Sequence, residues 1–161
     1  MSLSNKYTTT FLLTVFLGCT YIPTKAQDST AADHFKKGEY FLNNADYEEA
    51  ANSFDKSVKL DGQNQNTYLK LGFCHNLLGQ YEKAIDDFSK VIQLNPNHSW
   101  AYVSRGSARN KVGQYDLAIS DFNKALEFDP KDQEAYNNRG FAKKLSGDLA
   151  GACKDWQTSK K

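Results

Sequence analysis

The side chains that most often carry out chemistry in proteins are few in this chain. Its three histidines are His34, His75 and His98, and no two of them share a helical face with a carboxylate at the spacing that metal ligands need. The sequence contains no glycine-rich phosphate-binding loop and no Ser-His-Asp arrangement in a recognisable context. We therefore expect no metal site, no cofactor and no enzymatic activity.

Cys74 and His75 are adjacent, and they are the one pair that could act as a nucleophile with its base. Neighbouring residues on a helix point about 100° apart, so the thiol and the imidazole would not converge on one reacting atom. We therefore predict that His75 is a histidine of the protein core.

The positions of these residues depend on a repeat that organises nearly all of the chain. A glycine, an alanine and an aromatic residue each recur every 34 residues: Gly38, Gly72, Gly106 and Gly140; Ala50, Ala84, Ala118 and Ala152; Phe54, Phe88, Phe122 and Trp156. Such a period indicates one supersecondary unit that is stacked several times. The units are residues 31–64, 65–98, 99–132 and 133–161, within one domain of residues 27–161.

The pattern inside each unit predicts two antiparallel helices. Ala50, Phe54 and Val58 are four residues apart, which places them on one apolar stripe of a helix. The recurring glycine and alanine leave room for the two helices to approach closely. We expect this close packing to offset the loss of about 1 kcal/mol of stability that a glycine inside a helix causes relative to alanine. The glycines that suit a left-handed turn between the helices are Gly79, Gly113 and Gly147.

The third unit has the pattern of a known repeat. It reads Tyr102-x3-Gly106…Gly113-x-Tyr115-x2-Ala118-x3-Phe122-x2-Ala125…Pro130, and it closely resembles the tetratricopeptide repeat. The resemblance recurs four times and covers about 130 residues. It implies an all-α fold, a right-handed superhelix of about four helix-turn-helix repeats, and a protein–protein interaction module of the kind found in small exported bacterial proteins.

The resemblance also implies a binding surface, because the first helix of each tetratricopeptide unit lines a groove that holds a peptide or a helix. The groove residues expected here are Phe35, Leu42, Leu69, Phe73, Asn76, Trp100, Val103, Asn110, Asn137, Phe141 and Lys144. The aromatic residues predict an apolar or amphipathic partner, and the amides could hold its backbone. Some family members clamp a terminal carboxylate in this groove, but Glu39 would repel one.

Trp100 is the residue that we most strongly predict to contact a partner. It lies two residues before Tyr102, on a different face of the same predicted helix. The alternative is that its ring packs on the loop of residues 95–97.

Charge pairs between successive units are a further expectation. Arg105 and Arg139 occupy the seventh position of their units, and the preceding units carry Asp87 and Asp121 at the twenty-third position. We therefore predict the pairs Asp87–Arg105 and Asp121–Arg139, with two solvated charges as the alternative interpretation.

Cys74 and Cys153 belong to units that are separated by a third. A disulfide needs Cα atoms within about 7 Å, which helices two units apart exceed. We predict free thiols that fill the core.

Residues 1–26 do not belong to the repeat. Lys6 precedes an apolar run from Phe11 to Gly18, which is shorter than the roughly 20 residues that span a bilayer. The run is typical of a secretory signal peptide that is cleaved after Ala26. This interpretation predicts an exported protein, either periplasmic or secreted.

Two other interpretations of the N-terminus remain open. The segment Phe16-Leu17-Gly18-Cys19 looks like a bacterial lipobox, which would anchor the protein to a membrane through a lipid on Cys19. A segment that is retained, either disordered or packed, would instead leave the protein in the cytoplasm.

The charges are balanced, with 20 basic and 19 acidic residues and no basic stripe, so nucleic-acid binding is not expected. The leading prediction is a scaffold or adaptor that binds a protein or peptide partner. One alternative is a self-associating subunit of an envelope complex, which would pair through the C-terminal end around Leu149 and Trp156. Another is an accessory subunit of an enzyme or a hydrolase, although only Glu39, Glu134 and Lys144 are titratable groups of the predicted groove.

Overall fold

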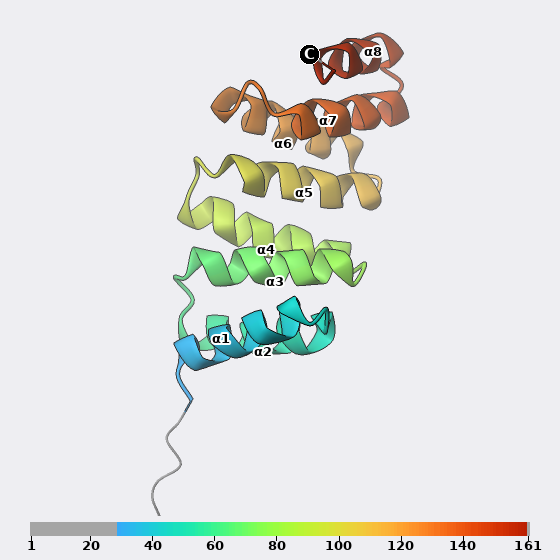
Figure 1. Ribbon diagram of the computed structural model, residues 1–161. Helices are drawn as coiled ribbons and strands as arrows, with labels where there is room; N and C mark the ends of the chain where they lie inside the picture. Colours follow the sequence, from blue (N-terminus) through green and yellow to red (C-terminus); the bar gives the residue numbers. More distant parts are fainter. Residues whose placement is uncertain (1–28, 161) are drawn as a thin grey trace, which may run out of the picture.

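The computed structural model describes residues 29–160, which form eight α-helices and no strand (Figure 1). The helices are α1 (Ala31–Asn43), α2 (Tyr47–Leu60), α3 (Gln65–Leu77), α4 (Tyr81–Leu94), α5 (Ser99–Lys111), α6 (Tyr115–Phe128), α7 (Gln133–Ser146) and α8 (Leu149–Thr158). They pair as four hairpins, which stack in chain order (Figure 1). The predicted all-α solenoid is confirmed. The predicted signal segment, residues 1–26, lies outside the described residues.

Each hairpin closes where a glycine of its first helix meets an aromatic ring of its second. A Cβ atom added to Gly106 would lie 2.9 Å from Phe122, and one added to Gly140 would lie 2.6 Å from Nε1 of Trp156. Real Cβ atoms almost never approach so closely, so a larger residue would push the helices apart. The close approach that the sequence predicted is therefore present in the fold.

The turns inside the hairpins use the left-handed conformation. Gly79, Gly113 and Gly147 have φ angles of +71°, +78° and +98°, as predicted. In the first hairpin the equivalent residue is Ala45, with a φ of 62°. An L-residue with a Cβ atom pays about 1–2 kcal/mol for this conformation, so the first turn is strained.

Small buried residues let one hairpin pack on the next. Cys74, Ala108 and Ala142 occupy equivalent positions on α3, α5 and α7, and all three are fully buried. The prediction that Cys74 fills the core is thus confirmed. The equivalent residue of α1 is Tyr40, which is 65% exposed, so the first hairpin presents a bulky and polar outer face.

Both thiols are free, as predicted, but Cys153 does not fill the core, because it is exposed. Its equivalents Ile85 and Ile119 pack against the cores around Phe88 and Phe122. Cys153 lies on α8, and no helix follows α8 within residues 29–160. The described part of the chain therefore leaves this thiol uncovered. Within the same residues, no helix is both long enough and apolar enough to cross a bilayer.

Replacing Ala45 with glycine should stabilise the protein. Relief of the left-handed strain, about 1–2 kcal/mol, exceeds the extra unfolded-state entropy of glycine, about 0.5–1 kcal/mol. We expect the free energy of unfolding, measured in urea, to rise by about 0.5–1 kcal/mol.

Gly79→Ala is the matched control for Ala45→Gly. A Cβ at Gly79 would meet nothing within 4 Å, so only the backbone conformation is tested. This variant should lose stability, and a gain at Gly79 or a loss at residue 45 would contradict the assignment of strain.

Candidate functional site

The first helices of the hairpins, α1, α3, α5 and α7, carry the exposed aromatic residues that the sequence predicted as anchors. Phe73, Trp100 and Phe141 are 38%, 43% and 48% exposed. The ring of Trp100 meets that of Phe88 edge-on, at 6.0 Å between centroids. Trp100 therefore contacts α4, and roughly half of its surface is open to solvent. We call the exposed side chains at the predicted groove positions of these four helices the first-helix surface.

One concavity of this surface is a hollow of about 390 Å³, the α5–α7 hollow. It is lined by Ser107, Asn110, Lys111, Asn137, Asn138, Phe141 and Trp156. Three of these residues, Asn110, Asn137 and Phe141, were predicted from the sequence. The structure thus brings the C-terminal part of the predicted groove together.

Hydrogen bonds hold the amides of the α5–α7 hollow in place. Asn110 Nδ2 donates to the carbonyl oxygen of Asn138 at 3.1 Å, and Asn138 Nδ2 donates to Ser107 Oγ at 3.2 Å. The indole Nε1 of Trp156 donates to the carbonyl oxygen of Asn137 at 3.2 Å. Because Asn110 joins α5 to α7, part of its hydrogen-bonding capacity is already used within the protein.

The N-terminal part of the predicted groove mostly serves packing. Phe35, Leu42 and Leu69 are half-buried and pack against the cores of their hairpins. The ring of Phe35 also carries the Lys70 ammonium at 5.8 Å from its centroid. These three side chains offer a partner less surface than the aromatic residues do.

Lys70 also pairs with Glu39, at 3.1 Å between Nζ and Oε1. One of the three titratable groups of the predicted groove is therefore engaged within the protein.

Val103 was predicted to face the groove, and that prediction is wrong. Its side chain is 2% exposed and packs in the core with Ala118, Phe122 and Ala135. The remaining predicted residues lie at the surface to different degrees: Asn76 is half-buried, and Asn137 and Lys144 are exposed.

Sequence reasoning missed Trp156, Asn138 and Lys111 as lining residues. Trp156 occupies the position of the core phenylalanines Phe54, Phe88 and Phe122 and was assigned to the core with them. The signal that could have found it is the change from phenylalanine to tryptophan, which adds an N–H group that needs a partner.

The predicted charge pairs Asp87–Arg105 and Asp121–Arg139 are wrong. Arg105 instead binds Asp121 of its own hairpin with two hydrogen bonds, 3.0 Å from Nε and 2.7 Å from Nη2. Arg139 binds Asp155 in the same way, at 2.8 and 2.6 Å. The reason is that the seventh and twenty-third positions of a unit face each other within one hairpin.

Each of these arginines still reaches the preceding hairpin through its third nitrogen. Arg105 Nη1 donates to Ser89 Oγ at 3.0 Å, and Arg139 Nη1 donates to Asn123 Oδ1 at 2.7 Å. The guanidinium groups thus join neighbouring hairpins, but they do so through neutral side chains.

Each of the two buried carboxylates, Asp121 and Asp155, also binds a second cation. Arg109 binds Asp121 at 2.8 Å, and Lys143 binds Asp155 at 2.9 Å. Burial alone would raise the pKa of Asp155, but the hydrogen bonds and charges of Arg139 and Lys143 outweigh burial and lower this pKa below its ordinary value. Asp155 is therefore stabilised as a carboxylate.

Asp87, in the second hairpin, has no such cations. Its partner is His75, whose Nδ1 lies 2.6 Å from Oδ2 of Asp87. Leu71 stands where Arg105 and Arg139 stand in the later units. Burial raises the pKa of Asp87, and the hydrogen bond and charge of His75 only partly offset this effect.

The Cys74–His75 pair is not arranged for nucleophilic chemistry. His75 is mostly buried, as predicted, with 14% of its side chain exposed, and its Nδ1 is engaged with Asp87. Burial raises the pKa of the Cys74 thiol to about 11, which leaves little thiolate at neutral pH. Within residues 29–160, no three His, Cys, Asp or Glu side chains come close enough to hold a metal ion.

Comparison with known families agrees with the geometry. Models of the tetratricopeptide repeat match residues 34–64, 66–98 and 106–147, which together span most of the chain. The chain belongs to the tetratricopeptide repeat family. No curated protein sequence matches it.

Several solved structures share the fold. A crystal structure of MamA is 26% identical, with a TM-score of 0.79 over 84% of this chain and 80% of that one. MamA from Desulfovibrio magneticus RS-1 is 23% identical, with a TM-score of 0.77 over 81% of this chain and 73% of that one. YrrB, described as a TPR protein with an unusual peptide-binding site, is 23% identical, with a TM-score of 0.77 over 80% of this chain and 66% of that one.

Asp155 and Asp87 should differ in their effect on stability. Asp155→Asn leaves Arg139 and Lys143 without their carboxylate, so we expect the free energy of unfolding to fall by about 3 kcal/mol at neutral pH. Asp87→Asn leaves no permanently charged side chain without its partner, so we expect it to lower the free energy of unfolding by about 1 kcal/mol or less.

The pH dependence at these two positions should have opposite signs. The lowered pKa of Asp155 gives stability that is present above its ordinary pKa and lost as the pH falls through the folded-state pKa. The raised pKa of Asp87 means that stability decreases as the pH rises from the ordinary pKa through the folded-state pKa. In urea unfolding between about pH 3 and pH 7, the deficit of Asp155→Asn should shrink on acidification and that of Asp87→Asn should grow. The same trend in both variants would contradict the opposite pKa shifts of the two carboxyl groups.

Proposed function

We propose that this protein is an interaction module that binds a polypeptide partner on its first-helix surface. The observation that carries the proposal is the α5–α7 hollow, where Phe141 and Trp156 lie near the side-chain amides of Asn110 and Asn138, which hydrogen bonds hold in place. Trp100 adds a half-exposed ring on the same set of helices. Preorganised sites of this kind lose little entropy when a partner binds.

The chemistry of the surface favours an apolar or amphipathic partner. Aromatic side chains dominate binding energy at protein interfaces, and the amides that line the hollow can donate to or accept from a partner's backbone. The likeness to MamA and to the peptide-binding protein YrrB supports a scaffold or adaptor, and the proposed role involves no catalysis.

Export is part of the proposal, with a periplasmic or secreted mature protein. It is supported by the apolar run of residues 11–18 and the small residue Ala26 before the proposed cleavage site. Intact-mass measurement of the protein from its native cell should find a chain that starts at Gln27. A lipid on Cys19 would favour anchoring, and a retained Met1 would reject export.

Self-association is the second candidate function. It is supported by the large exposed side chains near the end of the described chain, where Leu145 is 43% and Leu149 is 63% exposed. Light scattering over a range of concentrations tests it, because a mass that stays monomeric at high concentration excludes this role.

Truncating the exposed aromatic residues should weaken partner binding. For Phe141→Ala and Trp100→Ala we expect a loss of about 2 kcal/mol each, or roughly thirtyfold in affinity, with little effect on folding because both rings are half-exposed. The partner is first recovered by crosslinking in the native cell, and its affinity for each variant is then measured.

Tyr40→Ala is the control for these variants. Tyr40 is also aromatic and 65% exposed, but it lies on the outer face of the first hairpin. Its replacement should leave the affinity unchanged. Equal affinities for all three variants and the unaltered protein would reject the first-helix surface as the binding site.

A further inference from the structure

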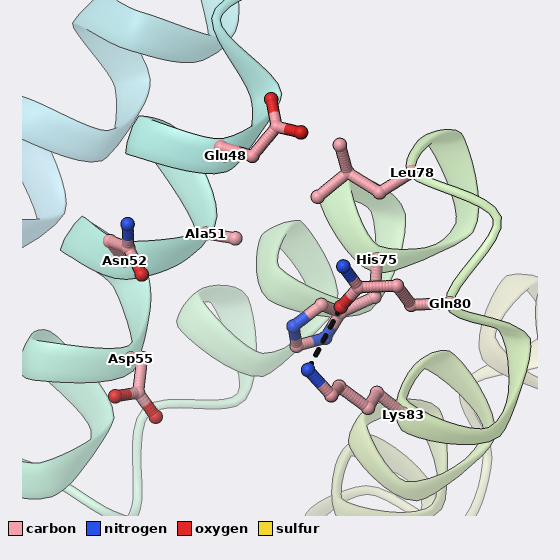
Figure 2. A pocket seen from close by; sticks show the side chains of 8 residues that line it. All are labelled: Glu48, Ala51, Asn52, Asp55, His75, Leu78, Gln80 and Lys83. Atoms are coloured by element: carbon pink, nitrogen blue, oxygen red, sulfur yellow. Dashed lines mark hydrogen bonds between the residues drawn. The ribbon is translucent and has the colours of Figure 1, made fainter.

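A second concavity lies between the second helices of the first two hairpins. This α2–α4 hollow has a volume of about 360 Å³, and Figure 2 shows the side chains that line it. They are Glu48, Ala51, Asn52 and Asp55 of α2, His75 of α3, Leu78 and Gln80 of the following turn, and Lys83 of α4. None of these residues belongs to the predicted groove or to the α5–α7 hollow.

The hollow exists because two residues are smaller here than in the later units. Ala51 stands where the next two hairpins have Ile85 and Ile119. His75 stands where they have the longer side chains of Arg109 and Lys143. Larger side chains therefore take up more of the same place between the later hairpins.

The later units also show which chemistry fits this place. Arg109 Nη1 donates to Asp121 Oδ2 at 2.8 Å and to the carbonyl oxygen of Leu117 at 3.4 Å. Leu117 is the equivalent of Lys83, and Asp121 is the equivalent of Asp87. In the third unit, a guanidinium group thus binds the aspartate whose equivalent in the second unit, Asp87, is bound by the shorter imidazole of His75.

The lining of the hollow is rich in hydrogen-bond acceptors. Glu48, Asn52 and Asp55 project from α2 on one side, and the imidazole of His75 projects from the other (Figure 2). When the imidazole is neutral and donates its Nδ1–H to Asp87, its Nε2 is a further acceptor.

Few positive charges lie near the hollow to repel an incoming cation. Lys83 is a cation of the lining and donates to Gln80 at 3.0 Å (Figure 2), and Lys59 pairs with Asp55. Residues 31–98 carry seven Lys and Arg against ten Asp and Glu, whereas residues 99–160 carry ten against eight. The hollow therefore belongs to the acidic half of the solenoid.

We propose that the α2–α4 hollow binds an arginine side chain of a basic polypeptide segment. The incoming guanidinium lies beside the imidazole of His75, in the space that the small side chain of Ala51 leaves, and it donates to the acceptors of α2 and to the imidazole. Arginine suits the hollow because its planar group offers five N–H donors. This site lies between second helices, so it does not depend on the proposed function of the first-helix surface.

The test uses a fluorescently labelled, end-blocked peptide with three arginines separated by serines, and its citrulline analogue, which is neutral and nearly the same shape. Fluorescence anisotropy should show that residues 27–161 bind the arginine peptide about tenfold or more tightly than the citrulline peptide. Equal affinities for the two peptides would overturn the proposal.

Filling the hollow separates a specific site from a merely acidic surface. Ala51→Ile introduces the residue that the later units carry, and it keeps every charge. We expect it to weaken binding of the arginine peptide about tenfold. His75→Arg is the second filling variant, because its own guanidinium should reach Asp87 as Arg109 reaches Asp121. Circular dichroism checks that both variants fold.

Two comparisons complete the design. Glu127→Gln should bind the arginine peptide with unchanged affinity, because it removes an exposed carboxylate of α6 that lies outside both hollows. Glu48→Gln combined with Asp55→Asn should weaken binding. If the double variant weakens binding but both folded filling variants retain full affinity, the attraction is diffuse and the proposed site is wrong.

Discussion

The contact between a glycine of the first helix and an aromatic ring of the second sets the geometry of every hairpin. With a Cβ atom at Gly38, Gly72, Gly106 or Gly140, the helices could not approach as they do, because that atom would lie within 3.0 Å of the ring. The same contact at the same place in four units gives hairpins of one shape. Hairpins of one shape stack regularly (Figure 1), and the regular stack aligns the first helices on which the proposed partner surface depends.

The candidate sites lie where individual units depart from their own repeat. Trp156 replaces phenylalanine and turns a core position into part of the α5–α7 hollow. Ala51 and His75 replace larger residues and open the α2–α4 hollow. In a repeat protein the shared residues build the scaffold, so the differences between units are where specific binding surfaces arise. The internal repeats also supply their own controls, since each departure can be reversed to the residue of another unit.

The errors of sequence reasoning have identifiable causes. Asp occupies the twenty-third position in the last three units, so the sequence cannot distinguish a pair within a hairpin from a pair between hairpins; the fold assigns Arg105 to Asp121. Val103 shares its position with Leu69 and Asn137, yet the three range from buried to exposed. A repeat position therefore predicts the face of a helix better than it predicts exposure, because exposure also depends on the size of the neighbouring side chains.

The sequence alone determined the repeat period, the all-α hairpins and the left-handed glycine turns. These features depend on local preferences and on spacing along the chain, which can be read without coordinates. Only the tertiary structure decided which charges pair, which groove residues are buried and where the two hollows lie. These depend on distances between side chains from different helices, and the replacement of one residue, such as Ile by Ala at residue 51, changes them without altering the pattern of the repeat.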